Sequence, residues 1–249
     1  MLFRSAQQST SPDYSQDFED ASRVIDWTGG GAVPGTWIVT DHPPSSGSAG
    51  KGYRPQDPGG PGAEITTFYM NQEAKEWTDY ALAFDVTLMQ PLVANAKVAC
   101  YLRYSDPGNY VKLEISEMEV RLSRRFHGAE LSSPPVPITP TDFVVRRPHK
   151  VLVSVAEKTA SFIIPALGIT WTTCDISPNP IGKTDPGGLS VKIGYTYGGV
   201  AGGSFIDTGE PGKGTIGLAV TAGAGFPANP VMFDNVSVSG GGSGGVGSS

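Results

Sequence analysis

Apolar and polar residues alternate with a period of two along much of the chain. In the segment DYALAFDVTL at 79–88, every second side chain from Tyr80 to Leu88 is apolar, and those between them are small or polar. This pattern is typical of a strand with one buried face. The segment KVACYLRY at 97–104 alternates in the same way. One of its faces is predicted to hold Val98, Cys100, Leu102 and Tyr104, and the other Ala99, Tyr101 and Arg103.

Short strand-like segments continue to the end of the chain. They are YVKLEIS (110–116), VRLSRRF (120–126), KVLVSVA (150–156), SFIIPAL (161–167), SVKIGYTY (190–197), TIGLAV (215–220) and VMFDNVSV (231–238). None shows the sustained spacing of apolar residues that an amphipathic helix needs. Many short strands separated by turn residues predict an all-β protein, either an antiparallel sandwich or a barrel.

The segments between and around these strands define the expected domain. Residues 1–16 have the polar composition of a lead-in, and the first five, MLFRS, match the translated end of a sequencing adapter. Residues 17–239 are expected to form one β-sandwich domain. Residues 240–249 are expected to be a Gly/Ser linker to a further part of a longer polypeptide, or an engineered tail. Residues 41–62 hold Pro and Gly at a density that predicts one long surface loop.

Composition narrows the class of partner. The 249 residues carry a net charge of −6, which disfavours nucleic acids and anionic membranes because both bind clustered Lys and Arg. No apolar run approaches the roughly 18 residues of a membrane helix. Two cysteines, Cys100 and Cys174, leave two alternatives open: two buried thiols, or one long-range disulfide.

A set of local motifs resembles one superfamily. The motifs are Trp77-Thr78-Asp79-Tyr80, the hairpin from Tyr101 to Tyr110, Gly217-Leu218 and Phe233-Asp234-Asn235. Together they resemble the concanavalin A-like lectin/glucanase superfamily, with the nearest likeness to the lectin-like domain of galactocerebrosidase-type enzymes and to 3-keto-disaccharide hydrolase domains. The resemblance implies an antiparallel two-sheet β-sandwich of the jelly-roll type, with the first and last strands side by side.

The resemblance also implies a structural Ca²⁺ ion where the two ends of the domain meet. Asp234 in the closing strand would supply a carboxylate, and Asp17 and Glu19 in QDFED would supply backbone or side-chain oxygens. Such a site is chemically reasonable because Ca²⁺ takes six to eight oxygen ligands. The alternative is that Asp234 caps a turn or meets a surface arginine.

The acidic segment EISEME does not match the active site of the superfamily's glucanases. Those enzymes place three acids at alternate positions of one strand, whereas Glu114 and Glu117 are an odd number of residues apart. We therefore expect a solvated hairpin turn here and no glucanase site. No catalytic residues are assigned, and whether the chain is an enzyme stays open.

Aromatic side chains are the more promising feature for binding sugars, because the C–H face of a pyranose packs on an aromatic ring. Tyr101 and Arg103 share a predicted face, as do Tyr195 and Tyr197, and both pairs are predicted to line one concave sheet. The alternative is ordinary cross-strand aromatic pairing.

These observations favour a non-catalytic carbohydrate-binding module of a larger secreted or cell-surface protein, with a glycan as partner and no insertion into a membrane. Two alternatives remain. One is a glycoside hydrolase similar to the 3-keto-disaccharide hydrolase and glucanase group; the other is a structural β-sandwich of a virion or appendage, with the Gly/Ser tail as connector.

Overall fold

The computed structural model describes residues 13–30, 33–34, 36–46, 48–133, 135–139, 143–157, 159–175, 194–197, 200–201 and 212–240. In these residues strands predominate, and the helical elements are short 3₁₀ turns: η1 (Ala21–Val24), η2 (Pro44–Ser46), η3 (Glu73–Glu76) and η4 (Pro165–Leu167). None of these turns has the length and apolar composition needed to cross a membrane.

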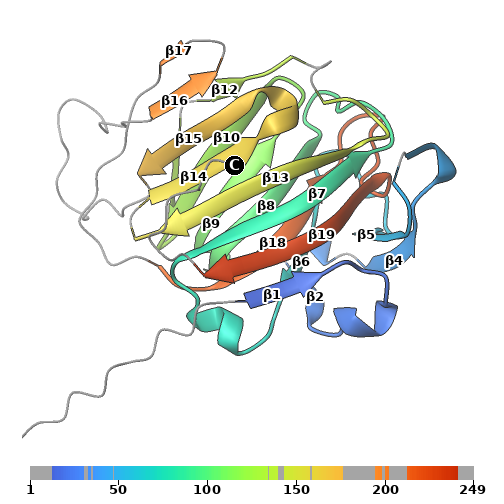
Figure 1. Ribbon diagram of the computed structural model, residues 1–249, viewed down its shortest axis with the longest axis horizontal. Coiled ribbons are helices and arrows are strands. Elements are labelled where there is room, and N and C mark those ends of the chain that lie inside the picture. The colour runs from blue at the N-terminus through green and yellow to red at the C-terminus, as the bar shows by residue number, and fades with distance from the viewer. Residues whose placement is uncertain are drawn as a thin grey trace, which may run out of the picture.

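The strands form two sheets packed face to face, as Figure 1 shows. The 10-stranded sheet, here called the front sheet, has the order β17 (Val200–Ala201), β16 (Gly194–Tyr197), β15 (Ile169–Asp175), β14 (Thr159–Ile164), β13 (Pro148–Ala156), β7 (Tyr80–Leu88), β19 (Val231–Gly240), β5 (Lys51–Pro55), β4 (Trp37–Asp41), with β1 (Asp13–Gln16) beside β19.

The 9-stranded sheet, here called the back sheet, lies behind the front sheet in Figure 1. Its order is β11 (Ala129–Ser132), β10 (Glu119–Phe126), β9 (Asn109–Ile115), β8 (Lys97–Asp106), β18 (Thr215–Thr221), β6 (Glu64–Tyr69), β2 (Trp27–Gly30), with β12 (Val136–Pro137) beside β10 and β3 (Val33–Pro34) beside β6. Among the described strands, β3 and β6 pair in parallel and the other pairs are antiparallel. The predicted all-β sandwich is confirmed.

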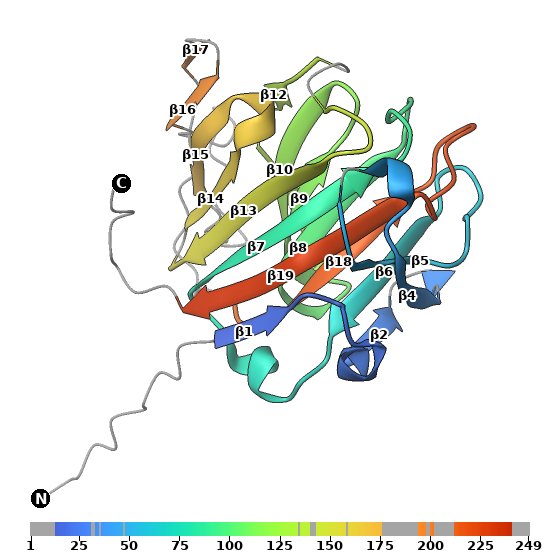
Figure 2. The same ribbon diagram turned by 45° about the vertical axis from the view of Figure 1, so that its right-hand side comes forward.

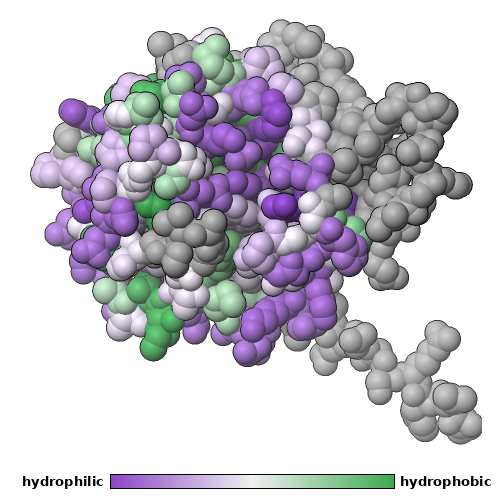
Figure 3. Space-filling view, turned by 180° about the vertical axis from the view of Figure 1, so that it is seen from behind, coloured by the Kyte–Doolittle hydropathy of each residue, from purple (hydrophilic) through white to green (hydrophobic). Residues whose placement is uncertain are grey.

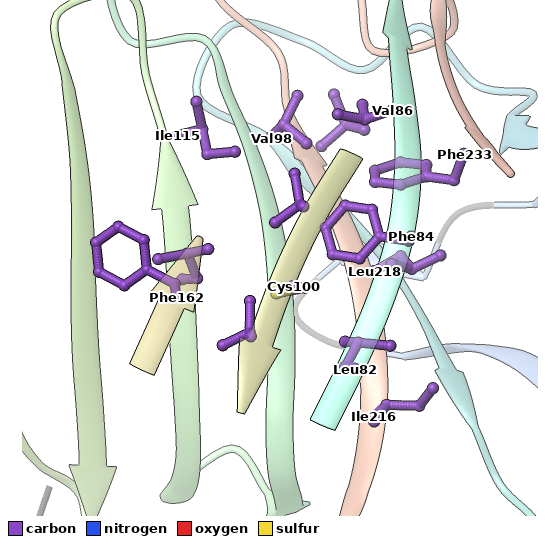
Figure 4. Packing of buried hydrophobic residues seen from close by; sticks show 14 of the residues in the cluster. Leu82, Phe84, Val86, Val98, Cys100, Ile115, Phe162, Ile216, Leu218 and Phe233 are labelled. Atoms are coloured by element: carbon purple, nitrogen blue, oxygen red, sulfur yellow. The ribbon is translucent and has the colours of Figure 1, made fainter. Parts of the chain in front are cut away.

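The core fills the space between the two sheets. The predicted apolar face of β7, from Tyr80 to Leu88, is almost completely buried. Figure 4 shows Phe84 and Phe233 of the front sheet near Leu218 of the back sheet. Cys100 is a buried free thiol, which rules out the alternative of a disulfide with Cys174. Burial raises the pKa of Cys100 to about 12, which keeps this thiol protonated at neutral pH.

The two ends of the domain lie side by side, as the resemblance implied. Strand β1 pairs with β19, with Gln16 opposite Val236, and both views show the two strands adjacent (Figures 1 and 2). The ring of Phe18 stacks on Tyr53 at a centroid distance of 4.8 Å, and Tyr53 pairs with Phe233 across β5 and β19. Strand β1 thus lies in the segment predicted as lead-in.

The prediction of one long loop at 41–62 is wrong, because this segment contains β5. Strand β5 lies between β4 and β19, with Tyr53 opposite both Val39 and Phe233. The Tyr53 side chain is buried among aromatic rings of the core. The segment therefore forms a strand although its overall composition is typical of a loop, because Tyr53 packs into the core.

Candidate functional site

The outer face of the back sheet carries a second cluster of apolar side chains, separate from the core. It consists of Phe68, Ala99, Tyr101 and Ala219, with Tyr104 and Tyr110 packed against it. Side chains alternate between the two faces of a strand, so β6, β8 and β18 each contribute to this cluster while their other residues fill the core. Figure 3 views the molecule from this side and shows hydrophilic side chains over much of the surface.

A β-bulge in β8 places Tyr104 on this outer face. Tyr101 lies opposite Gly217 and Tyr104 opposite Thr215, so three steps along β8 match two steps along β18. Arg103 takes up the extra residue with a φ of 48°. The prediction that Tyr104 faces away from Tyr101 is therefore wrong, because a bulge reverses the alternation beyond it.

Four rings form what we call the aromatic platform: Phe68, Tyr101, Tyr104 and Tyr110. Phe68 and Tyr104 stack with centroids 3.8 Å apart, and Tyr110 meets Tyr101 edge to face at 5.1 Å. Gly217 lies under the Phe68 ring, which a Cβ at that position would strike. Phe68 and Tyr101 are buried, whereas Tyr104 and Tyr110 are half-buried, so the latter two present ring surface to solvent.

Charged side chains continue the same face beside the platform. Lys112 Nζ donates to Glu64 at 2.5 Å and lies 3.0 Å from Glu114 Oε1, so one ammonium joins two carboxylates. Lys97 Nζ donates to the same Glu114 oxygen at 3.2 Å, and the Tyr101 hydroxyl donates to Glu64. We call Glu64, Lys97, Lys112 and Glu114 the ionic network.

Burial and charge act in opposite directions on the ionic network. Burial alone would raise the pKa of Glu114, but Lys112 and Lys97 outweigh burial and hold this pKa below its ordinary value. Burial alone would lower the pKa of Lys112, but Glu64 and Glu114 outweigh it and raise this pKa. The carboxyl group of Glu114 is thus held in a setting that favours its ionised form.

A polar pocket of ≈ 190 Å³ opens at the end of the ionic network. It is lined by Lys97, Glu114, Ser116, Glu119, Arg121, Glu130 and Ser132. The predicted hairpin turn lies here, since β9 ends at Ile115 and β10 begins at Glu119. Glu114 lies before this turn, in β9, where two lysines contact it. The aromatic platform, the ionic network and the polar pocket therefore lie next to one another on the outer face of the back sheet.

The structure separates the residues predicted to bind sugar. Tyr101 is 6% exposed, and its hydroxyl is used by Glu64. Arg103 is 4% exposed and donates to the carbonyls of Thr78 and Glu157 and to Asp79, so it holds the bulge and is not available to a ligand.

Tyr195 and Tyr197 belong to β16 of the front sheet, while β8 belongs to the back sheet. The two predicted pairs therefore do not line one sheet. The side chains of Tyr195 and Tyr197 lie outside the described residues.

The residues predicted to hold Ca²⁺ are bound to other groups of the protein. Asp17 accepts a hydrogen bond from the Glu19 amide at 3.2 Å, and Lys51 contacts Glu19 twice: its amide donates to Oε1 at 2.9 Å and its Nζ to the carbonyl at 3.1 Å. Asp234 Oδ2 lies 3.4 Å from Nε2 of His42. The described residues contain no group of three or more His, Cys, Asp or Glu side chains placed to hold a metal. Calcium binding through backbone oxygens stays a prediction.

Sequence reasoning did not identify the half-buried rings and the ionic network as one site. The signal was present in part, because YVKLEIS alternates Tyr110, Lys112 and Glu114 on its polar face. Glu64 could not be connected with them, because the strand order β6, β18, β8 and β9 is set by pairing between distant segments.

No protein-family model and no curated protein matches this chain. Among solved structures, the chain is similar to the carbohydrate-binding module CBM66 from Bacillus subtilis, with a TM-score of 0.50 and 15% identity over 86% of this chain and 95% of that one. The Crh5 transglycosylase in complex with NAG gives a TM-score of 0.49 and 12% identity over 92% of this chain and 84% of that one.

The GH43 protein BlXynB mutant from Bacillus licheniformis gives a TM-score of 0.47 and 10% identity over 97% of this chain and 41% of that one. At such identities the likeness to CBM66 concerns the fold alone. The chain is an antiparallel two-sheet β-sandwich, as the sequence motifs implied.

Proposed function

We propose that this chain is a non-catalytic carbohydrate-binding module whose ligand lies along the outer face of the back sheet. The observation that carries the proposal is the sequence of groups along β9: the half-buried ring of Tyr110, then Lys112, then Glu114 at the mouth of the polar pocket. Tyr110 and Glu114 are four residues apart, or roughly 13 Å in a strand. This length suits a short run of sugar units.

The chemistry of these groups matches that of a sugar. The rings of Tyr104 and Tyr110 offer apolar surface for the C–H face of a pyranose, and the pocket offers carboxylates and hydroxyls for its hydroxyl groups. The similarity in fold to a carbohydrate-binding module supports the same function. An extracellular or surface location, with further domains in the same polypeptide, is part of this proposal.

The ionic network disfavours hydrolysis, the main alternative. Lys112 contacts both Glu64 and Glu114, so two of their oxygens lie no further apart than the sum of the two contact distances, 2.5 and 3.0 Å. Such a spacing is near that of retaining glycosidases, about 5–5.5 Å. An acid catalyst, however, needs a raised pKa, and the pKa of Glu114 is lowered.

The test is a glycan array on the full chain, followed by calorimetric titration of the strongest ligand. We expect Tyr110→Ala and Tyr104→Ala each to weaken binding about tenfold, because stacking on a ring is lost. Phe126→Ala is the matched control: Phe126 is a half-buried aromatic residue of the same sheet that lies outside the platform.

Each outcome decides between the functions. Unchanged affinity in both tyrosine variants would overturn the proposed site. Release of reducing sugar from the bound glycan, abolished by Glu64→Gln or Glu114→Gln, would show a hydrolase. No binding to any glycan would favour the structural role.

A further inference from the structure

A second pocket lies at the opposite sheet, where β4, β5 and β19 meet. It has a volume of ≈ 460 Å³ and is lined by Thr40, Asp41, Pro43, Arg54, Met89, Asn229, Pro230 and Met232. Its strands belong to the front sheet, so it is separate from the proposed glycan face on the back sheet. Figure 2 shows β4 and β5 at one side of the molecule, away from β9 and β10.

Arg54 gives this pocket a positive charge without a carboxylate partner. Its Nη1 donates to the carbonyl of Asn229 at 3.0 Å and to that of Pro55 at 3.5 Å, which orients the guanidinium. Within the described part of the chain, these carbonyls are the partners of the Arg54 side chain. The remaining N–H groups are free to bind an anion, and a guanidinium binds a carboxylate with two parallel hydrogen bonds.

The wall next to Arg54 is apolar. Met232 belongs to β19 but not to the core cluster, whereas its neighbours Val231 and Phe233 do, so its side chain lies on the other side of the strand, where it is 2% exposed and forms the floor of the pocket. Met89, Pro43 and Pro230 complete this surface. Methionine and proline side chains offer a flexible, uncharged contact for the C–H face of a small molecule.

Asp41 marks the other end of the pocket. Arg54 lies opposite Ile38 in the pairing of β4 with β5, and Asp41 is three residues further along β4, or roughly 10 Å away. This odd spacing places Asp41 on the alternate face of the strand, but Asp41 is the last residue of β4 and lines the pocket from the end of the strand. The Asp41 side chain has no partner among the described residues. A ligand that fits both ends carries a carboxylate for Arg54 and hydroxyl groups that donate to Asp41.

We propose that this pocket binds a glycuronic acid residue, with its carboxylate on Arg54, its hydroxyl groups on Asp41 and its ring on the methionine and proline wall. A simple anion would use Arg54 alone, and a neutral sugar would offer Arg54 only hydroxyl oxygens, without a charge to pair with the guanidinium. The assignment does not depend on the glycan site of the back sheet, because no residue is shared between the two.

The experiment titrates the ¹⁵N-labelled full chain with D-glucuronate, D-glucose or acetate and follows the amide signals of β4, β5 and β19. We expect glucuronate to bind most tightly, and Arg54→Gln to weaken its binding about tenfold or more because the charge-assisted bonds are lost. Arg147→Gln makes the same change of net charge at an exposed position outside the pocket and should leave binding unchanged.

Further variants separate the parts of the proposal. Asp41→Asn should weaken glucuronate binding but not acetate binding, and Tyr110→Ala should change neither. Equal affinity for glucose would overturn the role of Arg54, and equal affinity for acetate would overturn the sugar. Loss of binding in Arg54→Gln supports the proposal if the melting temperature of the variant matches that of the wild type. If it does not, Arg54→Lys is measured instead, because lysine keeps the positive charge but lacks the two parallel donors, and it should also bind glucuronate more weakly.

Discussion

The β-bulge at Arg103 in β8 and the β-bulge at Asn235 in β19 use the same backbone geometry in different surroundings. The two residues have φ values of 48° and 49°. In each strand, three steps match two steps of the neighbouring strand: Tyr101 to Tyr104 against β18, and Asp234 to Ser237 against β7. A positive φ is costly for an L-residue, so each bulge must be stabilised by its surroundings.

The stabilising contacts differ in number and in burial. Arg103 is buried and bound to Thr78, Asp79 and Glu157, which come from two other segments. Asn235 is exposed, and its contacts are Asp85 on the adjacent strand and the side chain of Asp234. Asparagine tolerates a positive φ better than arginine does. Both bulges use contacts from distant parts of the chain, but the β19 bulge is also favoured by the residue type at its positive φ, whereas the β8 bulge depends on the partners of Arg103.

The acidic groups near the two bulges also differ. Lys112 and Lys97 outweigh burial at Glu114, beside the platform, and lower its pKa. At Asp234, burial is the largest effect and raises the pKa, although His42 lies nearby. Near the β8 bulge, two lysines thus more than offset the effect of burial on the Glu114 carboxylate. Near the β19 bulge, His42 offsets the effect of burial on the Asp234 carboxylate only in part.

The largest expected effect is that of Arg103→Ala. It removes the buried guanidinium from two carbonyls and from the Asp79 carboxylate, which keeps, among the described residues, only the Glu157 amide as a donor, so we expect a loss of about 3–5 kcal/mol in the free energy of unfolding. Urea denaturation followed by circular dichroism measures it. Arg121→Ala, at a half-exposed ion pair with Glu119, is the control and should cost below about 1 kcal/mol. Equal losses in the two variants would show that the β8 bulge is not held by Arg103.

The ionic network beside the β8 bulge should make stability depend on pH. Because the folded pKa of Glu114 is lowered, its contribution is present above its unfolded pKa and is lost as pH falls through the folded pKa. We expect Glu114→Gln to lose about 2 kcal/mol at pH 7, since Lys112 then lacks one partner. The difference from the wild type should shrink on acidification.

Urea denaturation of both proteins between neutral and acidic pH measures this difference. Glu117→Gln is the control: Glu117 lies in the adjacent turn and has no ion pair among the described residues. A difference between wild type and Glu114→Gln that stays constant with pH would contradict the assigned ion pairs.

The predictions made from sequence were right where the local pattern decides the structure, and wrong where tertiary contacts decide it. Alternation identified β7 and the first part of β8 correctly, because each residue there continues a period of two. It failed at Tyr104, because nothing in the residues YLRY shows that Arg103 will be bound by loops before β7 and after β13.

The sequence could predict the type of residues in the candidate site, but not which of them are accessible to a ligand. An aromatic, polar outer face could be anticipated from Tyr101 and its neighbours, but which rings stay accessible depends on packing: Phe68 covers one side of Tyr104, and Glu64 takes the hydroxyl of Tyr101. Glu64 and Lys112 are 48 residues apart in the chain, and only the order of strands in the back sheet brings them together.

A smaller effect is expected at the β19 bulge. Asn235→Ala should lose about 1 kcal/mol, because alanine is strained at a positive φ and cannot donate to Asp85. Asn235→Gly removes the strain but also the hydrogen bond, so we expect a change within about 0.5 kcal/mol. Thermal unfolding compares the two variants. Equal losses in the two variants would show that the side-chain contact, which both lack, and not the backbone conformation, stabilises this bulge.

The smallest effect is expected for calcium at the junction of β1 and β19. Lys51 already places an ammonium group against the Glu19 carbonyl, in the position where a cation would share that oxygen. We therefore expect millimolar Ca²⁺ to change the melting temperature of the wild type little, and that of Lys51→Ala more, because the variant frees the carbonyl for a metal. Lys150→Ala, at an exposed position on β13, is the control for the loss of one positive charge. A large shift in the wild type that Asp234→Ala abolishes would instead establish the calcium site that the sequence motifs implied, and would show that the β19 bulge is stabilised by a metal as well as by its own side chains.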